Sequence, residues 1–276
     1  MPVVHISGPD DPRVALYRHV PDGELLRAHG LFVAEGRFVV ERLLSDRRFH
    51  VLSLLLNEAA SRALQPVLAD LGGQIDVFIG APRDFEALTG HDIHRGCLAL
   101  ASRPAPLPLD ELLENARFLI VLEEIANADN IGGVFRNAAA FDVDGVVLSR
   151  GCADPLYRKA IRTSMAATLR VPFSVAAVDD GWPQTLARLR AGGFSVVALT
   201  PREPARDLDE YARSTRHDRM ALLLGAEGAG LSPEAEESAD VRVRIGIRSD
   251  VDSLNVAVAA GIALHRLLPS AELREE

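Results

Sequence analysis

The sequence predicts an α/β protein with two domains, a small one at residues 1–104 and a larger one at 116–276. Three observations lead to this prediction. Short apolar runs alternate with helix-like segments along the chain, as expected for strands that alternate with helices. Three prolines at alternate positions within residues 101–109 disfavour a helix and indicate a stiff, extended connector. The length of 276 residues also suggests two domains, or one large domain with a small extension.

The first 104 residues predict a small α/β domain that lacks a nucleotide-binding glycine loop. Its strands are expected at residues 31–34, 51–56, 75–79 and 97–101, and its helices at 37–44, 58–71 and 83–88. His91, Asp92 and His94 lie close together before the last of these strands. Because three loop residues without a fourth ligand are more often a polar loop than a metal site, we expect no metal here.

Residues 105–115 are expected to lead into the second domain, where strands and helices alternate as in a parallel, doubly wound sheet. The strands are expected at residues 118–122, 145–148, 195–199, 220–224 and 241–245, and the helices at 131–141, 156–164, 182–191, 233–238 and 253–268. Ligands of such sheets bind beyond the carboxyl ends of the strands. The loops after residues 122, 199, 224 and 245 are therefore the candidate functional loops.

The composition is that of a soluble globular protein, with 48% hydrophobic and 25% charged residues. The formal net charge of −9 argues against a nucleic acid partner, although net charge is a poor guide to a local basic patch. Cys97 and Cys152 lie far apart, which fits a reducing compartment and argues against a disulfide framework. Without a membrane-length apolar run or a signal-peptide pattern, we expect a cytoplasmic protein with no membrane partner.

The loop after residue 122 opens a helix that starts with unusual residues. Asn130 is expected to cap this helix. Gly132 and Gly133 each cost up to about 1 kcal/mol of helix propensity against Ala, which favours a close approach by another backbone or a ligand. Arg136 follows on an otherwise apolar or small helix, so it needs an anionic partner, either a ligand or one of the glutamates at 123–124.

The loop after residue 224 has three glycines within six residues, at positions 225, 228 and 230. A plain turn from strand to helix does not need so many, so we expect backbone N–H and C=O groups that are exposed to a ligand. Glu227 within this loop is a candidate acid, base or hydrogen-bond acceptor. Ser232 is expected to cap the next helix, with Pro233 at its favoured first position.

The third loop, residues 245–255, leads into a C-terminal helix whose body is almost wholly apolar or small. Ser253 is expected to cap this helix through its hydroxyl. Asn255 is not needed as a cap, and helix interiors disfavour asparagine because its amide competes for backbone groups. The amide either faces solvent or has a function other than helix formation.

Together and in this order, the three segments resemble the signature motifs of the SpoU/TrmH family, the RNA ribose 2′-O-methyltransferases of the SPOUT class. The motifs are Asn-x-Gly-x-x-x-Arg-x-Ala at 130–138, Gly-x-Glu-Gly-x-Gly-Leu at 225–231 and Ser-Leu-Asn-Val-x-x-Ala at 253–259. The resemblance covers residues 116–268. Residues 33–37 and 94–96 resemble, more loosely, the L30-like RNA-binding domain that these enzymes often carry.

The resemblance implies a deep trefoil knot in the C-terminal part of the chain, a rare exception to the rule that chains avoid knots. The knotted loops would bind S-adenosyl-L-methionine. The implied cofactor contacts are Leu199, Thr200, Gly225, Ile245 and Leu254. The implied catalytic residues are Arg136, Asn130, Glu227, Ser253 and Asn255. The resemblance also implies a homodimer with its site near the subunit interface, and no metal.

The function that we expect is S-adenosylmethionine-dependent 2′-O-methylation of a ribose in structured RNA. We favour rRNA over tRNA because the extra N-terminal domain would supply a second RNA contact. Arg136 would hold an RNA phosphate and fix the 2′-hydroxyl, and its constant protonation disfavours a role as a simple base. The alternatives are a catalytically inactive, knotted RNA-binding protein and a doubly wound enzyme that acts on a small molecule.

Three positions depart from the family pattern. Asn127-Ala128 stands where Asp-Pro is usual, Gly246 where a proline is usual, and Ala166 where a glycine is usual. Loss of a proline loosens a loop without removing a functional group. These changes therefore bear on loop rigidity and on the choice of substrate.

Overall fold

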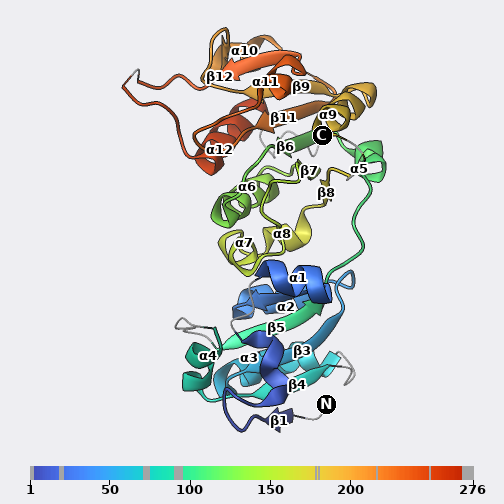
Figure 1. Cartoon of the computed structure of the whole chain (residues 1–276), viewed down its shortest axis with the longest axis vertical. Coiled ribbons are helices and arrows are strands. Elements are labelled where there is room, and N and C mark those ends of the chain that lie inside the picture. Colours follow the sequence, from blue (N-terminus) through green and yellow to red (C-terminus); the bar gives the residue numbers. More distant parts are fainter. Residues whose placement is uncertain are drawn as a thin grey trace. The chain divides into compact units, whose positions relative to one another are not determined.

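The computed structural model describes residues 3–18, 22–70, 75–89, 96–177, 179, 181–215, 217–248 and 250–268 (Figure 1). The chain divides into two compact units. The first unit joins Met1–Ala105 to Leu156–Leu169, and the second joins Pro106–Pro155 to Arg170–Glu276. The chain therefore passes between the units three times.

The first unit contains a mixed sheet with the strand order β1-β4-β3-β5-β2. Strand β4 is parallel to β1 and β3, whereas β5 is antiparallel to β3 and β2. The strands are β1 (Val3–His5), β2 (Leu31–Glu35), β3 (Val51–Leu56), β4 (Asp76–Ile79) and β5 (Cys97–Ser102). The helices are η1 (Pro12–Tyr17), α1 (Asp22–His29), α2 (Arg37–Ser45), α3 (Glu58–Asp70), α4 (Pro82–Thr89) and α7 (Arg158–Thr163). The predicted strands and helices of this region are confirmed, while β1, η1 and α1 were not predicted.

The core of the first unit explains why hydrophobic periodicity in the sequence does not predict helices η1 and α1. Val14 and Tyr17 of η1 and Leu25 of α1 are buried in one apolar cluster with residues of the sheet. The Tyr17 hydroxyl donates to the carbonyl of Ser53 at 2.9 Å, and burial raises its pKa. These short segments are held by tertiary packing rather than by a long amphipathic pattern.

The segment Leu156–Leu169 belongs to the first unit, although the sequence-based boundaries assign it to the second domain. Within this unit the backbone N–H of Arg158 donates to Asp22 at 2.8 Å, and the Arg162 guanidinium lies 3.4 Å from the Glu35 carboxylate. The sequence predicts helix α7 itself, at residues 156–164. Hydrophobic periodicity identifies a helix but does not tell which unit it packs with.

Ala166, one of the departures from the family pattern, adopts a left-handed backbone conformation with a φ of 67°. A glycine takes up this conformation without strain, whereas a residue with a Cβ pays about 1 kcal/mol. Met165 next to it also has a positive φ, of 53°. The turn is therefore preserved here without the usual glycine, at a cost in backbone strain.

The second unit contains a parallel sheet with the strand order β10-β12-β9-β11-β6-β7-β8. Its strands are β6 (Phe118–Leu122), β7 (Gly145–Leu148), β8 (Phe173–Val175), β9 (Ser195–Leu199), β10 (Arg206–Asp207), β11 (Met220–Leu224) and β12 (Val241–Arg244). Its helices are α5 (Leu109–Asn115), α6 (Ala128–Ala140), α9 (Trp182–Ala191), α10 (Leu208–Ser214), α11 (Pro233–Glu237) and α12 (Val256–Leu267), while α8 (Ala167–Arg170) contains the boundary between the units. The predicted doubly wound parallel sheet is confirmed.

The connector differs from the prediction in its second half. Residues 103–108 form neither a helix nor a strand, as the prolines favour, but Leu109–Asn115 form helix α5 instead of a linker. The helix follows Pro108, and its residues Leu109, Leu112 and Leu113 are buried in the core of the second unit. A seven-residue helix is too short for periodicity to reveal it among prolines.

Both faces of the second sheet are covered. Leu119 and Val121 of β6 lie in one core cluster with residues of α5, α9 and α11. The alternate residues Ile120 and Leu122 are also fully buried, so the opposite face is covered as well. No helix within the described residues is long and apolar enough to cross a membrane. The strands β12, β9, β11 and β6 are adjacent and parallel, so the loops that follow them all lie at the carboxyl edge of the sheet (Figure 1).

Candidate functional site

A pocket of about 520 Å³ lies at the carboxyl ends of β9, β11 and β12. This is the edge at which parallel sheets bind ligands. The pocket is lined by Leu199, Thr200, Pro201, Leu224, Gly225, Ala226, Glu227, Gly228, Gly230, Leu231, Ile245, Ile247, Asp252, Ser253, Leu254, Val256 and Ala259. All five residues that the resemblance implies as cofactor contacts are among them. Three segments far apart in the sequence thus form one concave surface.

The glycine loop, residues 225–231, is shaped by its own backbone. The chain folds back on itself, because the N–H of Gly230 donates to the carbonyl of Ala226 at 2.9 Å. A Cβ on Gly225 would overlap the backbone of Gly230 and Leu231. Gly228 and Gly230 have positive φ values of 82° and 71°. The glycines are therefore required by the loop conformation itself, a reason that the sequence alone did not reveal.

A buried carboxylate fixes the end of the glycine loop. Glu123, only 3% exposed, accepts hydrogen bonds from the backbone N–H and the hydroxyl of Ser232, at 2.8 and 2.7 Å. The Ser232 oxygen also accepts from the N–H of Ala235, so Ser232 caps α11 with Pro233 at the first helical position, as predicted. Sequence reasoning considered Glu123 only as a partner for Arg136 and missed this role.

Three of the five expected catalytic residues form what we call the polar cluster, Asn130, Glu227 and Asn255. The side-chain N–H₂ group of Asn255 donates to Oδ1 of Asn130 and to Oε1 of Glu227, each at 2.9 Å. Its Oδ1 accepts from the backbone N–H groups of Ala257 and Val258. An asparagine amide has two N–H bonds and two lone pairs, so all of its hydrogen-bonding capacity is used. Asn255 therefore holds the other two residues in place.

The structure corrects two of the three predicted helix caps. Asn255, and not Ser253, is the N-cap of α12, which begins at Val256. Asn127, and not Asn130, caps α6 by accepting from the N–H of Asp129 at 2.9 Å. Serine and asparagine are both good caps, so the sequence could not decide between residues only a few positions apart. Asn127, a departure from the family pattern, thus has a structural role.

Helices α6 and α12 pack closely beside the polar cluster. A Cβ on Gly133 would lie only 2.7 Å from Cβ of Ala257, so this glycine permits the contact. The expected close approach at this glycine is confirmed, and the neighbour is another helix. The side chain of Asn137 donates to the carbonyl of Ala257 at 2.6 Å and ties the two helices together. The sequence analysis did not identify Asn137. The only hint of its role in the sequence is that a polar side chain stands on a helix face of small residues.

Arg136 and Ser253 are placed differently from the polar cluster. Arg136 is exposed and has no hydrogen bond or ion pair to the described residues. Arg136 is therefore not buried as expected, and the alternative that pairs it with a glutamate is wrong, since Glu123 binds Ser232 and Glu124 accepts from the Ser149 hydroxyl at 2.8 Å. Ser253 is exposed and lines the pocket. An exposed guanidinium stays charged and can receive an anion from solution.

Metal-ligating side chains do not gather in the described part of the chain. No group of three or more His, Cys, Asp and Glu residues there could hold a metal ion. His91, Asp92 and His94 lie outside the described residues.

Beyond β12, the guanidinium of Arg248 holds the pKa of Asp250 below its usual value through two hydrogen bonds of 2.9 and 3.0 Å. Both charges of this exposed pair therefore persist at neutral pH.

Several proteins named as RNA methyltransferases are similar to the chain over most of its length. An uncharacterized tRNA/rRNA methyltransferase of Mycobacterium tuberculosis is 40% identical over 270 residues, which cover 95% of this chain and 91% of that protein. A 23S rRNA (guanosine-2′-O-)-methyltransferase of Acinetobacter baylyi is 32% identical over 240 residues, which cover 83% of this chain and 94% of that protein.

Solved structures share the fold of the chain. An AdoMet-bound rRNA methyltransferase from Sinorhizobium meliloti superposes with a TM-score of 0.79 at 22% identity, covering 96% of this chain and 97% of that one. The model of the SpoU rRNA methylase family matches residues 117–265, which include the glycine loop and the polar cluster. From the matched family model and the relatives above 30% identity, the chain belongs to the SpoU rRNA methylase family of RNA methyltransferases.

Proposed function

We propose that this chain uses S-adenosylmethionine to methylate the 2′-hydroxyl of a ribose in structured RNA, with rRNA preferred over tRNA. One observation carries the proposal. Glu227 lines the pocket and also belongs to the polar cluster, so the ligand site and the set of polar side chains lie next to each other. Such an arrangement suits a reaction in which two substrates must be aligned. The relative from Acinetobacter baylyi is named as a 23S rRNA 2′-O-methyltransferase, which favours rRNA.

The pocket fits S-adenosylmethionine in size and chemistry. Its volume of about 520 Å³ falls in the usual range for cofactor sites, about 300–1,000 Å³. Apolar side chains such as Leu199 and Ile245 suit an adenine ring, while the carboxylates of Glu227 and Asp252 suit hydroxyl groups and a positive charge. When bound, S-adenosylmethionine would supply an electrophilic methyl group. We assign its binding to Leu199, Thr200, Gly225, Ile245 and Leu254.

We assign the RNA side of the site to four of the five predicted catalytic residues. Arg136 would hold a phosphate next to the target ribose, because its guanidinium is exposed, charged and without a partner among the described residues. Asn130 and Glu227 would orient the ribose, since one group of each side chain makes no hydrogen bond to the described residues. Ser253 would contribute its hydroxyl from the pocket rim. The 2′-hydroxyl as the acceptor makes the polymer RNA.

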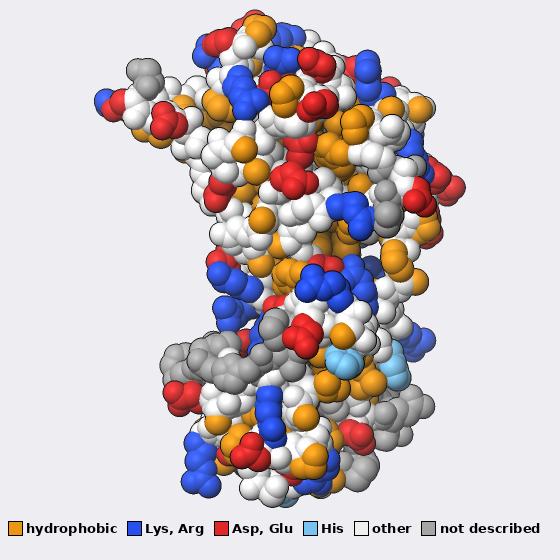
Figure 2. Space-filling model, viewed as in Figure 1, with side chains coloured by type: hydrophobic (Ala, Val, Ile, Leu, Met, Phe, Trp, Pro, Cys, Tyr) orange, Lys and Arg blue, Asp and Glu red, His pale blue; other side chains and the backbone are white. Residues whose placement is uncertain are grey.

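The distribution of charge supports an RNA contact in the first unit. That unit contains 14 Lys and Arg and 13 Asp and Glu residues, a formal charge of +1, against 16 and 26, a charge of −10, in the second. On α2, Arg37 and Arg42 are exposed, and the Arg42 guanidinium lies 5.1 Å from the ring centre of the exposed Phe38. Figure 2 shows basic side chains interspersed with acidic ones rather than one continuous basic face. An arginine beside an exposed aromatic ring suits contact with unpaired bases of an RNA.

Three further properties are part of the proposal, and the first two follow from the family resemblance. We expect a homodimer, which sedimentation of the purified chain tests. We expect a trefoil knot in the C-terminal part, which an experimental structure traced through residues 195–268 tests. We also expect the protein to act in the cytoplasm, since Cys97 and Cys152 are both unpaired, which fits a reducing compartment.

Calorimetric titration and a methyl-transfer assay test the proposed activity together. The purified chain should bind S-adenosylmethionine and transfer its labelled methyl group to deproteinised rRNA. Arg136→Ala should abolish transfer but leave cofactor affinity unchanged. Arg117→Ala is the matched control, because Arg117 is also exposed but lies at the amino end of β6, the opposite edge of the sheet.

Two results would go against this proposal. If the chain binds no S-adenosylmethionine at millimolar concentration, it is not a methyltransferase of this kind. If it binds RNA without transferring a methyl group, the alternative of a catalytically inactive RNA-binding protein is correct. Normal turnover by Arg136→Ala would show that our role for Arg136 alone is wrong.

A further inference from the structure

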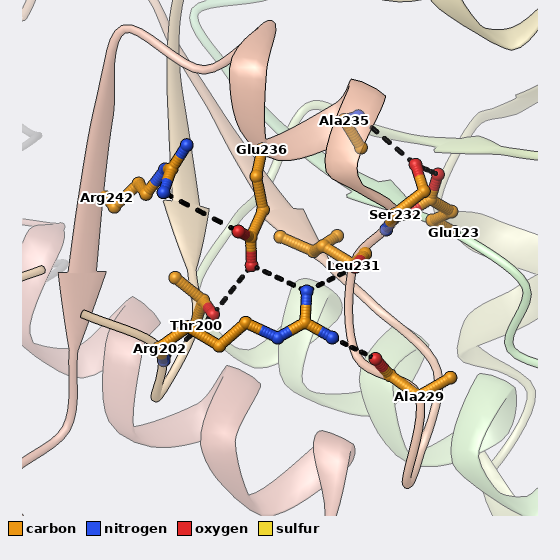
Figure 3. A network of polar contacts seen from close by, with 9 residues as sticks. All are labelled: Glu123, Thr200, Arg202, Ala229, Leu231, Ser232, Ala235, Glu236 and Arg242. Carbon is orange, nitrogen blue, oxygen red and sulfur yellow. Dashed lines mark hydrogen bonds and ion pairs between the residues drawn. The ribbon is translucent and has the colours of Figure 1, made fainter. Parts of the chain in front are cut away.

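Glu236 of α11 is a buried carboxylate that the proposed reaction does not use. Its side chain is only 8% exposed. It accepts a hydrogen bond from the Thr200 hydroxyl at 3.0 Å and from the Arg202 guanidinium at 3.3 Å, and Arg242 of β12 lies 3.6 Å away (Figure 3). A carboxylate removed from water requires such partners. Glu236 thus ties the segment after β9 to β12 and α11.

Arg202 uses the rest of its guanidinium to hold the glycine loop. Nη1 also donates to the carbonyl of Leu231 at 2.9 Å, and Nη2 donates to the carbonyl of Ala229 at 2.6 Å (Figure 3). The planar guanidinium presents several N–H groups in fixed directions, so one side chain can serve two carbonyls and a carboxylate at once. Both carbonyls belong to the second half of the glycine loop.

Arg202 holds residues that line the pocket but does not itself line it. Thr200 and Pro201, directly before it, line the pocket, as do Gly230 and Leu231 of the loop that it holds. Arg202 itself is not one of the lining residues. It therefore connects two of the three segments that form the pocket without entering it.

The glycine loop needs such external support. Its three glycines make the unfolded loop more flexible, so more conformational entropy is lost when one conformation is fixed. Glu123 fixes the loop only at its end, through Ser232. Between Gly225 and that point, the loop presents carbonyls, and the two that Arg202 binds are those of Ala229 and Leu231.

We propose that Arg202 is a positioning residue of the cofactor site, whose guanidinium, held by Glu236, keeps the glycine loop in the conformation that binds S-adenosylmethionine. The proposal rests on the proposed function. It predicts that Arg202 contributes to cofactor affinity and not to the transfer step.

Cofactor affinity and amide hydrogen exchange of the full chain test this proposal. Arg202→Ala should weaken S-adenosylmethionine binding about tenfold, as expected for the loss of charged hydrogen bonds at a half-exposed side chain. The KM for the cofactor should rise in parallel, while kcat at saturating cofactor stays unchanged. Without any cofactor, the amides of residues 226–231 should exchange faster, above all that of Gly230, which donates to Ala226.

Arg244→Ala is the matched control. Arg244 and Arg202 have equally exposed side chains, 47% each, and each forms an ion pair, but Arg244 binds Glu203 and none of the loop carbonyls. Arg244→Ala should therefore match the wild type in affinity and exchange. Arg202→Lys keeps the charge near Glu236 but lacks the planar fork, so it should lie between wild type and Arg202→Ala. It also serves as the second variant if Arg202→Ala does not fold.

The outcomes separate this proposal from the proposed function. Wild-type affinity and wild-type loop exchange in Arg202→Ala would overturn the role of Arg202 while leaving the function intact. Faster exchange across the whole second unit, rather than in residues 226–231, would show general destabilisation and also overturn it. A wild-type chain that binds no S-adenosylmethionine would overturn the proposed function, and the exchange data would still decide whether Arg202 holds the loop.

Discussion

Asn255 has a different role from the one that its residue type suggests. All of its amide hydrogen bonds are made inside the protein, to Asn130, Glu227 and the start of α12. It has no capacity left for a ribose hydroxyl in this arrangement. Its importance for catalysis would therefore be indirect, through the position of Asn130 and Glu227. Ser253, which lines the pocket, does not cap α12.

The cap of α12 predicts that two substitutions two positions apart affect stability to different extents. Asn255→Ala should lower the free energy of unfolding by about 1 kcal/mol, because α12 loses its N-cap. Ser253→Ala should change it by less than about 0.5 kcal/mol, because Ser253 does not cap the helix. Urea unfolding of both variants measures this difference. The assignment of the cap is refuted if Ser253→Ala is the more destabilised of the two.

Local sequence signals place the strands well and the helix starts less well. Phe118–Leu122 and Met220–Leu224 were predicted to the residue, because a continuous apolar run defines a buried parallel strand. The starts of α6 and α12 were displaced by three residues, since each lies near two or more residues that can act as caps. The choice between them depends on the path of the preceding loop, which is set by contacts between distant segments.

The packing of α6 against α12 makes Gly133 sensitive to the smallest added side chain. Gly133→Ala should gain up to about 1 kcal/mol in helix propensity but lose about 1–3 kcal/mol through overpacking against Ala257. We therefore expect a less stable protein in thermal or urea unfolding. The double variant Gly133→Ala with Ala257→Gly should recover most of the loss. A single variant as stable as the wild type would mean that the helices do not pack this closely.

The start of the first unit contains a carboxylate whose charge supports folding. Asp11, the N-cap of η1, accepts hydrogen bonds from the Arg13 side chain and from Ser7, which hold its pKa well below the usual range. A lowered pKa in the folded state adds stability above the unfolded pKa of about 3.9, and this stability is lost as the pH falls below it.

Asp11→Asn tests this pH dependence. At pH 7 the variant should unfold at a lower urea concentration than the wild type. Between pH 4 and strongly acidic pH the two midpoints should converge, because the wild-type carboxyl then becomes protonated as well. A difference in midpoint that stays constant from pH 7 to pH 2 would exclude the carboxylate charge as its cause.

At the scale of the whole molecule, the division into units could not be predicted from local patterns. The proline-rich connector marks the first crossing between the units, close to where the sequence predicts it. The return of Leu156–Leu169 to the first unit has no such signal, because its contacts, such as Arg162 with Glu35, join residues more than a hundred positions apart. The functional loops were found from their order and spacing, whereas Arg202 and Glu236 lie outside every motif.

The unequal charge of the two units predicts where RNA affinity depends on basic side chains. Replacing both Arg37 and Arg42 of α2 by alanine should weaken RNA binding but leave S-adenosylmethionine affinity unchanged. The slope of log affinity against log salt should become shallower by about 1 for each phosphate contact that is lost. Filter binding at several salt concentrations measures it. An unchanged slope would exclude these arginines from the RNA contact.

The central claim is that the chain methylates a ribose oxygen, and position-resolved mapping of the methyl group tests it most directly. Deproteinised rRNA and tRNA from cells that lack the gene should be incubated with the purified chain and S-adenosylmethionine, then cleaved by mild alkali, which requires a free 2′-hydroxyl. We predict one new site of resistance to cleavage in the rRNA, absent with Arg136→Ala and already present in the rRNA of cells that have the gene. A methyl group found on a base, or no new resistant site in either rRNA or tRNA, would contradict the account.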